Sequence, residues 1–303
     1  MSTILIKYNF LYLNILILFF SYTLDAQTKD YRTAINKAEL AFKKENYTDA
    51  LEAYKAAFRK KSEYNYFNLL KATKCAVALN KNRQAYKFIV KAIKSGCKLT
   101  RLEENEFYGI NELYQKKLIT HYPKLRKRYV EALEFETIIE LERMDILDQF
   151  VRIEEIFFDS VGIITWLKVD STNIEKLTHL TKKGGWLSPK RVGFDVSIIA
   201  FSILLHGTSD EINDKEQIDF FRPYLLAAIK NGEESPLRYA TLIDRYRLWF
   251  EDKKQLYGSF NSNKEFNAIE NIKEVDMRRK NLGLESLKDY AFKNDLSTPE
   301  GYN

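Results

Sequence analysis

Apolar positions over residues 31–96 recur at helical spacing in two units that are 35 residues apart. Small and large apolar residues alternate within each unit, and the polar pair Glu45-Asn46 interrupts the first one. The matching positions are Ala50 and Ala85, Tyr54 and Ile89, and Ala57 and Ala92. Because small residues let antiparallel helices approach closely while large ones fill the space beside them, each unit is predicted to be a helical hairpin.

Helical periodicity continues after the two hairpins. Residues 101–116 are predicted to form one arm of a third helical pair. The sequence His121-Tyr122-Pro123 marks a break, with Pro123 at the first position of a long helix that runs from Lys124 to about Phe158. We expect this long helix to join two domains.

Start and stop signals divide the C-terminal half into further helices. Thr172 and Glu175 form a capping box, which predicts the start of a short helix that ends at Gly184-Gly185. Other helices are expected over residues 189–206, 213–230, 236–250 and 272–282. Because no alternating strand pattern of useful length is present, the predicted fold class is all-α. We expect an α-solenoid of helical hairpins, joined by the long helix to a second helical domain.

Residues 1–26 have the organisation of a bacterial export signal. Lys7 supplies the positive charge, residues 10–20 form an apolar core, and Ala26 is a small residue at the expected cleavage point. A retained membrane anchor is the alternative, but Lys7 and Asn14 shorten the apolar stretch below the roughly 20 residues that span a bilayer. After cleavage no transmembrane span is expected, and the protein is expected in the periplasm or outside the bacterial cell.

Positive charge is concentrated in the N-terminal third of the chain. The whole chain has a formal net charge of +6, but residues 27–100 alone contain 17 Lys or Arg against 6 Asp or Glu, a net +11. This asymmetry, together with the chain length, favours two domains. The expected division is a signal peptide (1–26), tetratricopeptide-like repeats (27–100), a helical connector (101–140), a second helical domain (141–295) and a tail (296–303).

The two cysteines, Cys75 and Cys97, would meet an oxidising environment after export, so a disulfide must be considered. The hairpin prediction places Cys75 in the first helix of the second hairpin and Cys97 just after its second helix. The two would then be roughly 15–20 Å apart, whereas Cα atoms in a disulfide are roughly 6 Å apart. We predict that they are not bonded to each other.

Motifs of several enzyme classes are missing from the sequence. It contains no Gly-rich phosphate loop, no CxxC, no HExxH and no GxSxG. The three histidines, His121, His179 and His206, are too scattered along the chain to indicate a zinc site. We therefore expect neither a metal nor a cofactor.

Charged residues in the C-terminal half are the candidates for chemistry. Asp148 and Arg152 share one helical face, although a surface ion pair explains that spacing as well. His206, at the end of an apolar helix, can exchange a proton near neutral pH, and a packed structural histidine is the alternative. The candidate catalytic residues are His206, Asp244 and Asp276. The candidate ligand-binding residues are Asp148, Gln149, Arg152, Arg245, Tyr257, Arg278 and Arg279.

The hairpin pattern over residues 31–96 resembles the tetratricopeptide repeat. The residues that carry this resemblance are Ala38, Phe42, Tyr47, Ala50, Tyr54 and Ala57 in the first unit, and Thr73, Asn80, Asn82 and Ala85 in the second. The resemblance implies stacked hairpins with a concave groove that binds a partner.

Residues 141–293 resemble a bacterial family of helical domains of unknown function. The elements are Asp148-Gln149-x-x-Arg152, Val169-Asp170-x-x-Asn173, Gly185-Trp186, Val192-Gly193, Leu204-Leu205-His206, Asp244-Arg245, Gln255-x-Tyr257-Gly258 and Val275-Asp276-x-Arg278-Arg279 followed by Gly283-Leu284. Because that family has no established activity, the resemblance implies a domain boundary and a set of residues, but no mechanism.

An exported interaction module is the expected function. The repeat groove would bind a protein or peptide partner, and the net +11 favours acidic peptides, anionic glycans or a negatively charged membrane face. Nucleic acid is not expected, because no base-reading motif is present. A purely structural role in the cell envelope is a further reading. The remaining alternative is a hydrolase-like enzyme whose site gathers His206 as acid or base with Asp244, Arg245, Tyr257, Asp276 and Arg279.

Overall fold

The computed structural model describes residues 27–60, 65–153, 160–208, 214–251 and 253–302. The expected signal peptide over residues 1–26 lies outside the described residues. Helices form nearly all of the regular structure in the described part of the chain. The strands found there are β1 (Asn261–Ser262) and β2 (Glu265–Phe266), which pair as a short antiparallel hairpin. The all-α fold class is therefore confirmed.

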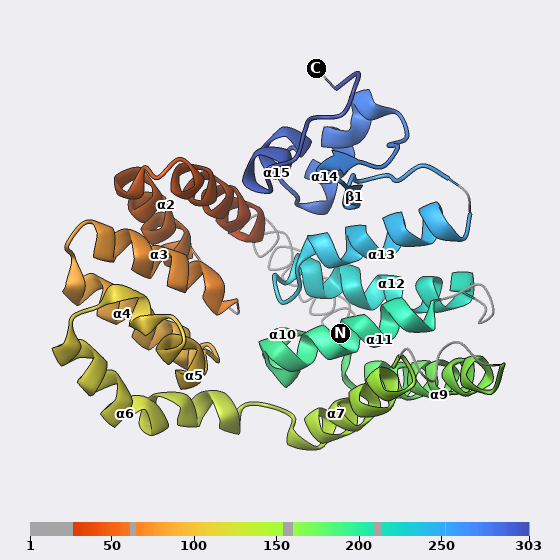
Figure 1. Ribbon diagram of the computed structural model, residues 1–303, viewed down its shortest axis with the longest axis horizontal. Helices are drawn as coiled ribbons and strands as arrows, with labels where there is room; N and C mark the ends of the chain where they lie inside the picture. Colours follow the sequence, from red (N-terminus) through yellow and green to blue (C-terminus); the bar gives the residue numbers. More distant parts are fainter. Residues whose placement is uncertain (1–26, 61–64, 154–159, 209–213, 252, 303) are drawn as a thin grey trace, which may run out of the picture.

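The N-terminal half consists of two helical hairpins (Figure 1). The first pairs a helix over residues 27–43 with α2 (Tyr47–Lys60), and the second pairs α3 (Tyr66–Ala78) with α4 (Asn82–Lys94). Both hairpin turns contain a residue with left-handed backbone, Glu45 (φ 57°) and Asn80 (φ 58°). These two residues are 35 positions apart, so the repeat seen in the sequence is also a repeat of backbone conformation.

The predicted third helical pair is wrong in its details. The connector contains α5 (Leu99–Glu103), a short 3₁₀ helix η1 (Glu106–Gly109) and α6 (Glu112–Glu131). Pro123 does not start a helix but lies inside α6. Its side chain is exposed, so the helix accommodates it without a clash in the core.

The predicted long helix over residues 124–158 is interrupted. Helix α6 ends at Glu131, and α7 (Phe135–Phe150) follows after a short turn. In that turn the main-chain N–H of Glu134 donates to the carbonyl of Arg191 over 3.0 Å. The two Glu134 carboxylate oxygens also accept hydrogen bonds of 2.6 and 2.7 Å from the Arg191 guanidinium. A tertiary contact of this kind has no signature in the local sequence.

The C-terminal half is built from α9 to α15. The elements are α9 (Ser160–Gly184), α10 (Pro189–Val192), α11 (Phe194–Gly207), α12 (Asp214–Lys230), α13 (Pro236–Trp249), η2 (Ile272–Glu274), α14 (Val275–Leu282) and α15 (Leu287–Lys293). The end of α9 at Gly184 is confirmed. The capping box at Thr172 is wrong, because Thr172 lies within α9, whose helical pattern begins before it. The helix predicted over 189–206 is broken at Gly193 (φ 85°, ψ 160°), and α15 was not expected.

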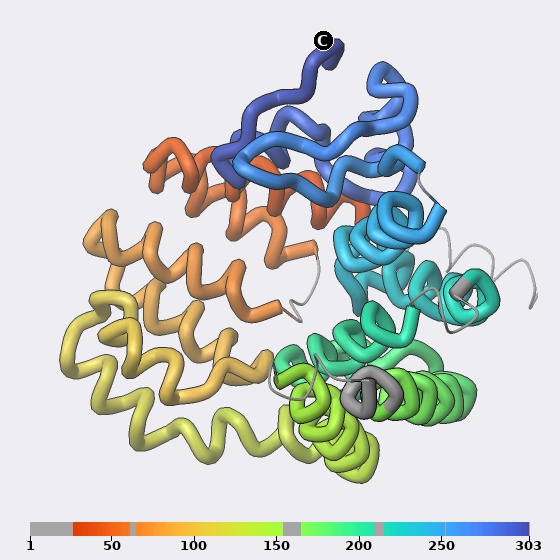
Figure 2. The backbone as a smooth tube through the Cα atoms, turned by 45° about the vertical axis from the view of Figure 1, so that its right-hand side comes forward, coloured from red at the N-terminus to blue at the C-terminus, as the bar shows by residue number. Residues whose placement is uncertain are grey.

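The backbone forms two helical halves (Figure 2), and among the described residues each half has a hydrophobic core of its own. The first contains buried residues between 38 and 118, and the second contains buried residues between 141 and 243. Tyr129 of α6 lies between the halves. A Cβ placed on Gly96 would be 2.5 Å from the Tyr129 ring, and one placed on Gly193 would be 2.7 Å from its hydroxyl. The two glycines therefore make room for the ring.

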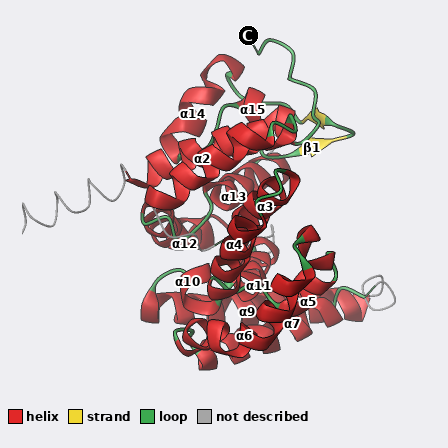
Figure 3. Cartoon of the chain, turned by 90° about the vertical axis from the view of Figure 1, so that its left-hand side faces the viewer, coloured by secondary structure: helices red, strands yellow, loops and turns green. Residues whose placement is uncertain are grey.

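The C-terminal helices pack against the N-terminal helix: α14 and α15 lie beside residues 27–43 (Figures 1 and 3). The side chain of Asn36 donates to Asp289 over 2.7 Å, and Lys43 pairs with Asp295 at 2.6 Å. Glu39 accepts a hydrogen bond of 2.8 Å from Lys293 of α15. Within the described residues, no helix has both the length and the apolarity needed to cross a membrane.

Candidate functional site

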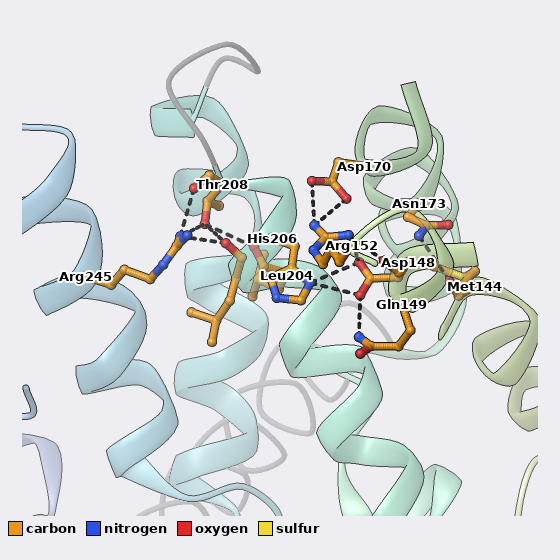
Figure 4. Close-up of polar contacts among 11 residues, drawn as sticks. Met144, Asp148, Gln149, Arg152, Asp170, Asn173, Leu204, His206, Thr208 and Arg245 are labelled. Carbon is orange, nitrogen blue, oxygen red and sulfur yellow. Dashed lines mark hydrogen bonds and ion pairs between the residues drawn. The ribbon is translucent and has the colours of Figure 1, made fainter. Parts of the chain in front are cut away.

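A cluster of polar residues joins the ends of α7 and α11 to the middle of α9 (Figure 4). Asp148 is in the last turn of α7, and Arg152 follows just after that helix. Asp170 and Asn173 come from the middle of α9, and His206 comes from the last turn of α11. Five residues from distant parts of the sequence are thus brought together.

His206 and Asp148 form the centre of this cluster. The Nδ1 atom of His206 lies 3.0 Å from each carboxylate oxygen of Asp148. The Asp148 side chain is 1 % exposed and the His206 side chain is 30 % exposed. Because an ionised carboxylate only accepts hydrogen bonds, the contact requires the proton to be on Nδ1. In the neutral ring, Nε2 is then the nitrogen that could take a proton from a bound molecule.

Arg152 connects two buried carboxylates. Its Nη2 atom donates to both oxygens of Asp170, at 2.8 and 2.7 Å, while Nη1 lies 2.9 Å from Asp148. Nη1 also donates to the Asp148 main-chain carbonyl over 2.8 Å. Burial raises the pKa of Asp170, and the hydrogen bond and charge of Arg152 oppose that rise. The guanidinium is thus held by the protein itself, so an external anion would have to displace a carboxylate.

Two amide side chains and a third carboxyl complete the cluster. Gln149 donates to Asp148 over 2.8 Å, and Asn173 donates to the main-chain carbonyl of Met144 over 3.3 Å. The pKa of Asp145 is raised by burial and by the charge of Asp148, while His206 opposes the rise. No group of three or more metal-ligating side chains is found in the described part of the chain. The arrangement suits proton transfer at His206.

Asp244 has a different role from the one expected. It is fully buried and accepts hydrogen bonds from the main-chain N–H groups of Leu256, Tyr257 and Ser259, at 2.6, 3.0 and 3.0 Å. The Ser259 hydroxyl adds a bond of 2.8 Å. Burial raises the pKa of Asp244, and these hydrogen bonds oppose the rise. The carboxylate therefore holds the loop after α13 in shape.

Arg245 caps a helix. Its Nη1 atom donates to the carbonyl of Leu205 over 2.6 Å and to that of Thr208 over 3.0 Å, at the end of α11 (Figure 4). The guanidinium also lies over the ring of Trp249, 5.1 Å from its centroid. A cation at a helix C-terminus satisfies the last carbonyls and complements the helix dipole.

The remaining candidates also bind the protein's own main chain. Arg278 donates to the carbonyls of Leu256 and Glu270, and buried Arg279 donates to those of Tyr257 and Glu285. Asp276 accepts from the main-chain N–H of Leu287 over 2.7 Å and from the Tyr302 hydroxyl over 2.6 Å. Burial raises the pKa of Tyr257 to about 12. The expected six-residue catalytic set is not gathered around His206, because its carboxylate partner is Asp148 and not Asp244 or Asp276.

The structure also contains a central cleft that the sequence did not indicate. Its volume is about 830 Å³, and its walls come from both halves of the molecule. One wall is formed by residues 28–39 and the first turns of α3, and the other by the start of α13 with α14 and α15. The cleft forms only where the C-terminal helices pack against the N-terminal helix, and local periodicity does not reveal that contact.

Charged side chains of both signs line the cleft. Glu39 lies between Lys71 and Lys293, at 2.6 and 2.8 Å. Glu234 lies 3.0 Å from Arg238 and accepts a bond of 2.7 Å from the indole of Trp186. The cleft thus combines apolar surface with charged groups, and Glu39 and Glu234 are each paired with a cation.

Comparisons with family models, curated proteins and solved structures find no match to this chain. The resemblances to the tetratricopeptide repeat and to the bacterial helical family therefore rest on the sequence features described above.

Proposed function

We propose that this protein is an exported binding module that holds a short peptide in the cleft between its two halves. The observation that carries the proposal is the cleft itself, whose volume of about 830 Å³ falls in the range of roughly 300–1,000 Å³ that is typical of ligand sites. Both halves contribute walls, so a bound chain would contact the hairpins and the C-terminal helices together. The export signal expected over residues 1–26 supports a location outside the cytoplasm.

The chemistry of the walls favours a peptide over an apolar ligand. Paired charges such as Glu39 with Lys71 offer both donors and acceptors, as the main chain of a peptide requires. The rings of Phe67 and Tyr290 add apolar surface for side chains. Lys280 also lines the cleft and forms no ion pair with the described residues, which favours an acidic group at that end.

A blocking substitution tests this proposal. Thr33 lines the cleft and is exposed, so Thr33→Trp fills the space without disturbing the core. Lys37, one turn further along the same helix, is exposed outside the cleft lining, so Lys37→Trp is the matched control. The wild-type protein is used to select binders from a phage library of random short peptides. Selected peptides should lose at least about tenfold in affinity for Thr33→Trp and none for Lys37→Trp.

Two outcomes would contradict the cleft as a peptide site. One is that the wild-type protein enriches no peptide. The other is that Thr33→Trp binds the selected peptides as tightly as the wild-type protein does. Unfolding curves of both variants show whether each substitution leaves the fold intact.

Acid–base catalysis at His206 is a second candidate function, and the 3.0 Å contact between its Nδ1 atom and Asp148 favours it. A buried carboxylate that orients an imidazole is a common arrangement for a general base. A panel of chromogenic esters and phosphodiesters tests this function. Hydrolysis that His206→Gln abolishes and His179→Gln preserves would support it, since His179 is exposed on α9. The absence of hydrolysis over the panel, or equal rates in both variants, would count against it.

A further inference from the structure

Helix α4 carries a stripe of positive charge that the peptide cleft does not use. Arg83, Lys87, Lys91 and Lys94 are all exposed, and no residue of α4 lines the central cleft. At 100° per residue these four side chains fall within an arc of about 80°, along roughly 16 Å of helix. We call them the basic stripe.

The basic stripe is not neutralised by the protein. None of its four side chains forms an ion pair with the described residues. The neighbouring carboxylate of Glu52 on α2 is taken up by Lys55, at 2.8 Å. Cations four positions apart repel each other, and positive charge in the first turn opposes the helix dipole. Lys91 and Lys94 lie in the last turn and complement the helix dipole, so folding accounts for these two cations but not for Arg83 and Lys87.

A shallow depression lies at the start of the stripe. It has a volume of about 570 Å³ and is lined by Asn80, Lys81, Asn82, Arg83, Gln84 and Lys87. Its lining therefore contains three amide side chains and three cations, with no acidic and no aromatic residue. Amides both donate and accept hydrogen bonds, as hydroxyl groups require, while the cations suit carboxylates or sulfates.

We propose that the basic stripe and this depression bind a linear anionic polysaccharide. The four cations rise along the helix by about 6, 6 and 4.5 Å, so they offer a row of charges to an extended chain that bears regularly spaced anions. The amides at one end match the hydroxyl groups that such a chain carries as well. This site is separate from the peptide cleft and does not depend on it.

Two other anionic partners fit the observations less well. A bilayer surface favours helices with an apolar face next to the charges, whereas α4 exposes no large apolar side chain. Single-stranded nucleic acid is bound through aromatic stacking, and no aromatic residue lines the depression. The polysaccharide is the partner that uses both the cations and the amides.

A charge-reversal experiment tests the proposal. The probe is a fluorescent oligomer of polygalacturonate, and its fully methyl-esterified form serves as the neutral probe. The test variant is Lys87→Glu with Lys91→Glu. The control is Lys273→Glu with Lys288→Glu, which makes the same charge change at exposed positions in η2 and α15.

We expect the test variant to weaken binding of polygalacturonate by at least about tenfold, because two of the four cations become anions. The control and Thr33→Trp should bind as the wild-type protein does, the neutral probe should not bind, and added salt should weaken the wild-type complex. The reversal puts a carboxylate at position 87 four positions after Arg83, which is favourable, and four positions before the carboxylate at position 91, which is unfavourable. The two effects offset each other, so unfolding curves should give a midpoint close to that of the wild-type protein.

Three results would overturn the proposal. They are no binding of polygalacturonate at low salt, equal binding by the test variant, and tighter binding of duplex DNA or phosphatidylglycerol vesicles than of the polysaccharide.

Discussion

The hydroxyl of Tyr129 lies against Gly193 so closely that a Cβ at position 193 would be 2.7 Å from it. Burial raises the pKa of this hydroxyl, while the charge of Arg126 and the main-chain N–H of Phe194, the first residue of α11, oppose the rise. One side chain of the connector thus fixes the start of the helix that ends in His206.

Gly193→Ala should lower the free energy of unfolding by about 3 kcal/mol, because it combines a clash with a backbone conformation that only glycine adopts easily. Gly185→Ala is the matched control. Gly185 also has positive φ (84°) but nothing lies within 4 Å of its added Cβ, so it should cost only about 1 kcal/mol. Urea unfolding measures both values.

The contact with Tyr129 can be isolated by a double-mutant cycle. In a Tyr129→Phe background the hydroxyl is gone, so the cost of Gly193→Ala should fall by about 1 kcal/mol. Equal costs in both backgrounds would show that the Tyr129 hydroxyl does not restrict position 193.

Asp148→Asn should destabilise the protein by about 3 kcal/mol, because it leaves Arg152 with one buried carboxylate and replaces the charged acceptor of His206 with a neutral amide. Asp145→Asn should change stability by less than about 0.5 kcal/mol, since that carboxyl lies near Asp148 without an ion pair to a described residue. Similar losses for the two variants in urea unfolding would argue against a central role for Asp148.

Glu39 should make stability depend on pH in the acid range. Burial would raise its pKa, but the charges and hydrogen bonds of Lys293 and Lys71 outweigh burial and lower the pKa below 4.5. A folded-state pKa below the unfolded value gives stability that is present above pH 4.5 and is lost as the pH falls through the folded value.

In Glu39→Gln this acid-side loss should be smaller, as measured by urea unfolding between about pH 3 and pH 7. Asp295→Asn serves as the control, because its pair with Lys43 is exposed and contributes little. Parallel pH profiles for Glu39→Gln and the wild-type protein would rule out the proposed linkage.

Both thiols should be unreactive in the folded protein. Cys75 and Cys97 are buried and free, as predicted from the hairpin geometry, and burial raises their pKa values to about 11 and about 12. Thiolates are the reactive form, so a thiol reagent at mildly alkaline pH should label neither residue until the chain unfolds. Labelling of two thiols after unfolding without reductant confirms that no disulfide is present. Rapid labelling of the folded protein would mean that the second hairpin opens readily.

The sequence was most informative where short-range packing decides the structure. The alternation around Ala50 and Tyr54 predicted the hairpins, because a buried helix face requires that spacing in any context. It failed where distant contacts decide. The turn between α6 and α7 is held by Arg191, which is 57 residues from Glu134. The box at Thr172 satisfies a capping pattern, yet the preceding residues continue the same helix.

In the candidate site, too, the sequence indicated which residues take part but not which distant residues they contact. Asp148, Gln149, Arg152 and His206 were named from the sequence, and the structure brings them together. Their partner Asp170 was visible only as part of a motif, since helix spacing cannot show that α9 lies beside α7. Asp244 and Asp276 share the residue type of a catalytic acid, but nearby main-chain N–H groups occupy their oxygens.

Asn36, Glu39 and Lys43 contact residues that are more than 250 positions later in the chain. The ribosome therefore has to complete nearly the whole polypeptide before the second wall of the cleft can assemble. Nascent chains that stop before α15 would carry both helical cores but lack part of the cleft wall, so under the proposed function peptide binding would report on full-length synthesis.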